Sequence, residues 1–307
     1  MNGRHVRLIA AYSARYSVRG GIGLVFLLLS LSFGLLVANS LMQPVEIAIA
    51  QLAKHAPDQD PVERTRRAVE LTVDNARPAV EWVLTPSSAA TDRDSKRAIG
   101  AWADFLLDDR PALLSAIFLV LLFGWPLVVA CGAFDLYSGD IGSRQLRYQL
   151  LRADRGSIYL GRLLGMLATL TGVLGMLGLT VVAYTGLQLP MYTWPALVAW
   201  GAYGTAALVV VSLPYLAVCA WISASFSSAF ASLTVTTLVV GCVQLVPALA
   251  SRSYEDARYL SWLLPWGFQT RLFHPDALQV ALAVGGCALQ TAVFGWLGHR
   301  KFTRRDL

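Results

Sequence analysis

The chain has 307 residues, a formal net charge of +6 and only 14% charged residues against 56% hydrophobic ones. A soluble domain usually carries about 25% charged residues, so the composition excludes an ordinary soluble enzyme. The positive charge does not indicate nucleic acid as a partner, because the arginines lie in short clusters beside apolar stretches.

Four stretches hold no Asp, Glu, Lys or Arg, namely residues 20–45, 111–134, 163–251 and 277–298. A helix needs about 20 apolar residues to cross the hydrocarbon of a bilayer. The first, second and fourth stretches therefore each hold one span, and the third is long enough for three or four.

Three basic clusters flank these stretches and decide the number of spans. They are Arg4, Arg7, Arg15 and Arg19; Arg144, Arg147, Arg152, Arg155 and Arg162; and Arg300, Lys301, Arg304 and Arg305. The positive-inside rule places all three in the cytoplasm, which requires three spans in the third stretch. The sequence predicts an all-α, multi-pass protein of the inner (plasma) membrane. We expect six spans, cytoplasmic N- and C-termini, and a single transmembrane domain over residues 1–307.

Residues 1–19 are expected to form a cytoplasmic amphipathic helix. Val6, Leu8, Ile9, Tyr12 and Tyr16 recur at helical spacing among the arginines, which suits a helix lying on an anionic inner leaflet. A basic tail without structure is the alternative. The first span follows at about residues 21–41.

Residues 43–110 form a polar segment that we expect to be an extracytoplasmic helical insertion. Pro44, Pro61 and Pro86 are expected to punctuate it, residues 87–96 to form a loop and residues 98–107 a second short helix. Acidic residues at helical spacing, Asp104, Asp108 and Asp109, end the segment. A solvated helix face explains them better than a metal site, since hard cations need more oxygen ligands.

The remaining spans are expected at about residues 111–134, 163–187, 196–221, 229–249 and 277–296. Glycines in the third span, at positions 165, 172, 175 and 178, indicate close helix packing. Residues 252–276 form a second extracytoplasmic segment. Its apolar residues, among them Trp262, Leu263 and Trp266, predict a short re-entrant or interfacial helix.

Several kinds of chemistry have no residues to support them. The predicted spans contain no charged residue or histidine, which argues against a proton-driven transporter and an intramembrane protease. None of the three lysines, Lys54, Lys96 and Lys301, follows a glycine, so there is no phosphate-binding loop for ATP. The four cysteines lie in apolar stretches and indicate no disulfide framework. We expect no catalytic residue, cofactor or metal in this chain.

Residues 135–162 form a cytoplasmic segment longer than a simple turn. Leu146, Leu150 and Leu151 form an apolar helical face with arginines around it. Such a helix can lie on lipid or dock into a groove of a partner, and we expect Leu146 and Leu150 on the docking face. A surface helix that only holds two spans apart is the alternative.

This segment and the C-terminal residues carry a resemblance to a known family. The matching residues are Asp140, Leu146, Leu150 or Leu151, Arg155, Leu160-Gly161-Arg162, and the ending Phe302-Thr303-Arg304-Arg305-Asp306-Leu307. In this pattern the chain resembles the membrane subunit of ATP-binding cassette (ABC) transporters of the type-2 permease family. It departs from the family pattern at Arg144 and Gln145, where Gly-Thr is usual, and at Ala153, where proline is usual.

The resemblance implies a permease subunit, most consistent with an exporter, that works by alternating access. In the family, two membrane subunits, identical or paralogous, pair with two cytoplasmic ATPase subunits that bind the ATP. The implied ATPase-coupling residues are Asp140, Arg144, Leu146, Leu150, Leu151, Arg155, Gly161 and Arg162. The alternative function is a membrane-anchored assembly or signalling subunit that binds a partner through its extracytoplasmic hairpin without transport.

Overall fold

The structure is a computed structural model that describes residues 3–19, 22–55, 60–84, 93–253 and 264–305. Within these residues the secondary structure is helical, with no strand. Six helices are long and apolar enough to cross a membrane. They are α2 (Ile22–His55), α5 (Ala112–Ala133), α8 (Arg155–Gln188), α9 (Trp194–Ser225), α10 (Ala229–Ser253) and α13 (Ala277–Arg304). The expected all-α, multi-pass membrane architecture is therefore confirmed.

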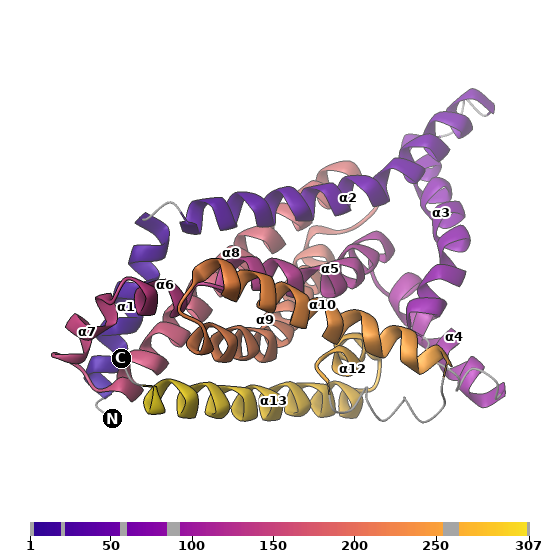
Figure 1. Cartoon of the computed structure of the whole chain (residues 1–307). Coiled ribbons are helices and arrows are strands. Elements are labelled where there is room, and N and C mark those ends of the chain that lie inside the picture. Colours follow the sequence, from indigo (N-terminus) through magenta and orange to yellow (C-terminus); the bar gives the residue numbers. More distant parts are fainter. Residues whose placement is uncertain (1–2, 20–21, 56–59, 85–92, 254–263, 306–307) are drawn as a thin grey trace.

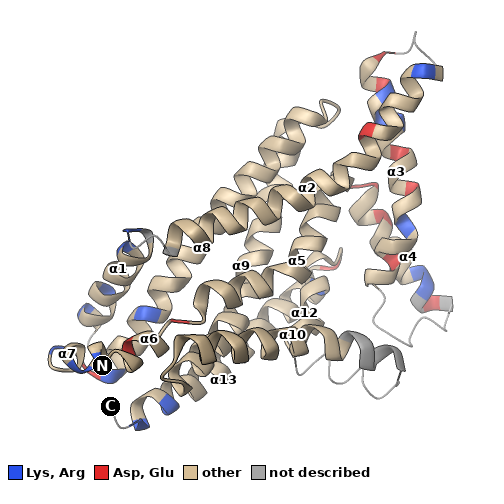
Figure 2. Ribbon diagram, turned by 45° about the horizontal axis from the view of Figure 1, so that its top comes forward, with Lys and Arg blue, Asp and Glu red and all other residues tan. Residues whose placement is uncertain are grey.

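The charged residues gather at the two ends of this bundle. Figure 1 places both chain termini, α1 (Gly3–Arg19), α6 (Ser138–Gly142) and α7 (Gln145–Leu150) at one end, and α3 (Pro61–Leu84) and α4 (Arg93–Leu107) at the other. Figure 2 shows basic and acidic residues at these ends and almost none between them. The uncharged middle fits the hydrocarbon, where an unpaired charge is costly.

Helix α2 is longer than the span expected at residues 21–41. It continues through Pro44 to His55, and its 34 residues make a rod of about 50 Å, longer than the hydrocarbon thickness of about 30 Å. The expectation that Pro44 punctuates the polar segment is wrong, because the helix continues through it. The far part of α2 instead packs beside α3 and forms one arm of a hairpin that extends from the bundle (Figure 1).

A salt-bridge cluster joins α3 to α4. Arg77 donates to the carboxylates of both Asp104 and Asp108, the second at 2.9 Å, and the hydrogen bond with Asp104 is the main reason that the pKa of Arg77 is raised. Asp104 and Asp108, two of the three clustered acids, are thus paired with Arg77. The described residues contain no group of three or more potential metal ligands. Helix α4 begins at Arg93, so the predicted loop is shorter than residues 87–96; residues 85–92 lie outside the described chain.

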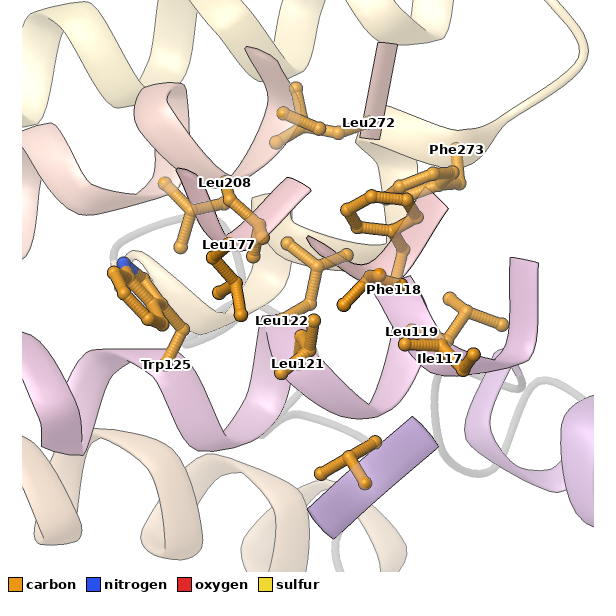
Figure 3. Close-up of a cluster of buried hydrophobic side chains, with 14 of the residues drawn as sticks. Ile117, Phe118, Leu119, Leu121, Leu122, Trp125, Leu177, Leu208, Leu272 and Phe273 are labelled. Carbon is orange, nitrogen blue, oxygen red and sulfur yellow. The ribbon is translucent and has the colours of Figure 1, made fainter. Parts of the chain in front are cut away.

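The core is centred on α5 and α9, the two spans whose residues are mostly buried. Figure 3 shows Ile117, Phe118, Leu121, Leu122 and Trp125 of α5 among side chains of α8, α9 and the segment before α13. Two buried indole groups donate hydrogen bonds to serines of the neighbouring helix. Trp125 Nε1 of α5 donates to Ser212 Oγ of α9 at 2.8 Å, and Trp200 Nε1 of α9 donates to Ser115 Oγ of α5 at 2.9 Å. These bonds satisfy buried polar groups that the apolar core could not otherwise accommodate.

The segment before α13 packs into the bundle as two short turns, α12 (Trp266–Gln269) and a 3₁₀ helix, η3 (Thr270–Phe273). Phe268, Leu272 and Phe273 are buried, and Trp102 of α4 donates its indole N–H to the Phe273 carbonyl at 2.7 Å. The described part therefore contains the short helix expected here, while Trp262 and Leu263 lie outside the described residues.

Glycines of α8 have different roles although they share one helix. A Cβ added at Gly165 would lie 2.8 Å from the Ala10 carbonyl oxygen and 2.7 Å from Ser13 Cβ, so α1 packs directly on the backbone of α8. A Cβ added at Gly178 would come still closer to the Thr205 side chain of α9. Gly172 and Gly175 have no neighbour within 4 Å of that position, so close packing is confirmed at only part of the predicted set.

Replacing Gly165 by valine should therefore separate α1 from α8, and Gly172→Val is the matched control on the same helix. Overpacking of this kind costs about 1–3 kcal/mol, whereas the control should stay within about 0.5 kcal/mol. Unfolding of the purified variants in detergent micelles measures both. Equal stability of the two variants would contradict the close α1–α8 contact.

Candidate functional site

The segment between α5 and α8 is attached at its start by hydrogen bonds to α9. Ser223 Oγ of α9 accepts the backbone N–H groups of Tyr137 at 2.9 Å and Ser138 at 3.1 Å. Asp135 Oδ1 accepts from Gly139 N at 2.6 Å and from the Ser138 hydroxyl. These bonds satisfy the free N–H groups at the beginning of α6 and fix where that helix starts.

Arg162 of α8 holds the middle of the segment. Its guanidinium forms a salt bridge with Asp140 of α6, and it also donates to the Leu136 carbonyl and to Gln149 Oε1 of α7, both at 3.0 Å. The Arg162 side chain is 12% exposed and the Asp140 side chain 27%. One cation thus joins the end of α5, both short helices and the beginning of α8, in a setting shielded enough for the pairing to matter.

Arg155 connects the same region to the C-terminal residues. Its guanidinium donates to the carbonyls of Thr303 at 2.8 Å and Arg305 at 2.7 Å. Immediately before it, Asp154 caps α8 by accepting from Ser157 N and Ser157 Oγ. The bond from the Ser157 hydroxyl is the main cause of the lowered pKa of Asp154.

Leu146 is part of the protein core at this end, not of an outward surface. It is 1% exposed and belongs to a buried cluster with Tyr137, Tyr159 and Phe302. Leu150 packs against this cluster while partly buried. The expectation that Leu146 lies on a docking face is therefore wrong: the three leucines do not share one outward side, because α7 turns its Leu146 side inward. Leu151, by contrast, is 83% exposed.

Arg144 and Gly161 have backbone roles in the segment. Arg144 has φ 60°, the left-handed conformation, and it lies directly before α7 at the turn from α6. A Cβ on Gly161 would approach Ile9 Cβ of α1 to 2.7 Å, so α1 also packs at the base of α8. The Arg144 side chain is exposed.

Five exposed residues of the segment carry its charge and its large side chains, and we call them the outer face: Arg144, Arg147, Tyr148, Leu151 and Arg152. Tyr148 is 75% exposed and Leu151 83%. The outer face combines three positive charges with two large side chains that have apolar surface, a composition common where proteins bind each other. The structure divides the eight predicted residues into three groups. Five are anchored (Asp140, Leu146, Arg155, Gly161, Arg162), Leu150 is partly buried, and two are exposed (Arg144, Leu151).

A polar network inside the bundle was missed by sequence reasoning. The Tyr215 hydroxyl of α9 accepts from the amides of Gln244 of α10 and Gln269 of α12, each at 2.8 Å. All three side chains are buried. The signal was present, since Gln244 stands in an otherwise apolar span, but a search for ionisable groups passes over an amide.

Comparison of the chain with protein-family models and with curated proteins gives no match.

Single replacements of Leu146 and Leu151 by alanine test which of the two leucines is buried and which lies on the outer face. Leu146→Ala should cost about 2–5 kcal/mol because it removes a buried side chain, and Leu151→Ala should stay within about 0.5 kcal/mol. Chemical unfolding of the two variants in micelles measures the difference. Similar losses of stability would contradict the orientation of α7.

Proposed function

We propose that this chain is the permease subunit of an ATP-driven ABC transporter, working as an exporter in the inner (plasma) membrane. The observation that carries the proposal is the ion pair between Asp140 and Arg162, which lie 22 positions apart in the sequence. Both residues belong to the pattern in which the chain resembles the type-2 permease family. A segment held in this way can transmit movement, whereas a loose loop cannot.

The backbone of Arg144 supports the same assignment. The family that the chain resembles usually has glycine at this position. Arg144 adopts φ 60°, a conformation that glycine reaches without steric cost. The family pattern and the geometry of this chain therefore agree at a position where the residue type itself differs.

In the proposed mechanism, a cytoplasmic ATPase subunit binds the outer face and supplies the energy of ATP. Movement of the ATPase is transmitted through Arg162 to the ends of α5 and α8, and through Arg155 to the end of α13. The spans then change the side to which their shared cavity opens, as a two-state element biased by a ligand on another chain. This chain needs no catalytic residue, metal or cofactor for that role.

A second permease subunit, identical or paralogous, is part of the proposal. The apolar parts of α10 and α13 are mostly exposed. Lipid or a second subunit can cover such surfaces.

A second candidate function is favoured by one observation. The hairpin of α2 and α3 extends from the bundle (Figure 1), and α3 carries exposed Leu71 and Trp82 on it. Exposed apolar side chains on a projecting element suit a partner-binding assembly or signalling subunit that transports nothing.

Binding of the ATPase is tested by Tyr148→Asp/Leu151→Asp, with Leu71→Asp/Trp82→Asp as the matched control at the other end of the molecule. The first variant should lose most of the ATPase that copurifies with the chain, because acidic residues on the outer face oppose docking, and the second should retain it. Both are compared at equal membrane expression.

If the variant at the outer face retains the ATPase, the proposed docking surface is wrong. If no ATPase copurifies with the unaltered chain and only the Leu71/Trp82 variant loses its partner, the second candidate function is correct.

The orientation of the bundle is tested by single cysteines in a cysteine-free chain. Ser143→Cys, between α6 and α7, should be protected from an impermeant thiol reagent in intact cells, and Arg66→Cys on α3 should react. Both positions are exposed, whereas Ser157 is buried and cannot report. The opposite labelling would contradict cytoplasmic termini.

A further inference from the structure

A pocket of about 550 Å³ lies between the C-terminal ends of α9 and α13, at the end of the bundle where both termini lie. Trp221 and Leu297 line its apolar part, and Ser225 lies beside them. Its other lining residues are all basic: Arg300, Lys301, Arg304 and Arg305. In the part of the chain that the structure describes, no carboxylate lines this pocket.

The walls of the pocket are fixed by close contacts. A Cβ on Gly298 would come within 3.1 Å of Trp221 Cα, so the backbones of α9 and α13 almost touch. The rings of Trp221 and Phe294 stack with centroids 6.2 Å apart. Arg305 donates to the carbonyls of Ala224 at 2.8 Å and Phe226 at 3.2 Å. The pocket therefore exists before any ligand binds.

The pocket lies where a span leaves the hydrocarbon. On α13 the uncharged stretch ends at Gly298, and the exposed Trp296 precedes the basic group. The Arg300 guanidinium lies 5.3 Å from the centre of the Trp296 ring. Tryptophan and arginine in this arrangement are typical of the boundary between acyl chains and headgroups. Farther into the span from this boundary, Leu289 and Val293 of α13 are also exposed.

We propose that this pocket binds the headgroup of an anionic phospholipid. The lipid phosphate lies among Arg300, Lys301 and Arg304, and an acyl chain follows the exposed apolar side of α13 toward Val293 and Leu289. Basic pockets between spans at the membrane surface are suited to such headgroups. The apolar lining beside the cations selects a lipid over a soluble anion, because a free phosphate would leave Trp221 and Leu297 uncovered.

The test measures thermal unfolding of the full chain in a neutral detergent, with three probes at equal concentration. Dioleoyl phosphatidylglycerol should raise the unfolding midpoint, and dioleoyl phosphatidylcholine, with the same acyl chains and no net charge, should not. Glycerol phosphate, with the charged group and no acyl chain, should also have no effect.

Two variants and a matched control locate the site. Arg300→Gln/Lys301→Gln/Arg304→Gln should weaken binding of phosphatidylglycerol about 100-fold, because three charges near the anionic group are lost. Leu297→Trp keeps every charge, fills the apolar part of the pocket and should also abolish the shift. Arg7→Gln/Arg15→Gln/Arg19→Gln removes three charges at the same end of the bundle, on α1, and should retain it.

Three results would overturn the proposal. An equal loss in the α1 variant would show general attraction of anionic lipid to this end of the molecule. An equal shift from glycerol phosphate would show a site for soluble anions. An unchanged shift in Leu297→Trp would place the lipid elsewhere. None of these outcomes depends on whether the chain transports a substrate.

Discussion

The salt bridge of Arg162 with Asp140 is the interaction on which the arrangement at the end of the spans depends. A short segment between two spans has few apolar contacts of its own, so its position must come from specific bonds. Arg162 donates to three acceptors with one side chain. Because α8 is a span, those acceptors are held in place relative to the bundle. Without this cation, α6 would still be joined to α9 by the Ser223 hydrogen bonds, but α7 would be joined to the spans chiefly through the buried Leu146.

Two further contacts extend this rigid unit. Gly161 and Gly165 let α1 pack on α8 just beside Arg162, and Arg155 holds the end of α13 through two backbone carbonyls. The N-terminal helix, the segment of α6 and α7 and the C-terminal residues therefore form one connected body. A partner that binds the outer face, or a lipid that fills the pocket beside α13, acts on this body and through it on the spans.

The sequence predicted the number and kind of spans because the cost of charge in hydrocarbon is large and local. It did not predict the length of α2, since Pro44 is tolerated inside a helix when the lost hydrogen bond is compensated. It predicted a short helix between the second and third spans but assigned Leu146 to the wrong side of it. Helical spacing alone does not say which side of a two-turn helix faces the core. The ion pair of Asp140 with Arg162 and that of Arg77 with Asp104 and Asp108 are set by tertiary folding, and no local pattern indicates them.

The central claim is that the segment of α6 and α7 is held rigidly to the spans by Arg162. Amide hydrogen exchange of residues 138–151 tests it most directly, in the unaltered chain and in Arg162→Gln. The account predicts protected amides in the unaltered chain. In the variant it predicts that exchange in this segment alone becomes faster by about tenfold or more. Loss of the Arg162 side-chain bonds lowers only the free energy of local opening. Amides that already exchange without protection in the unaltered chain would contradict it.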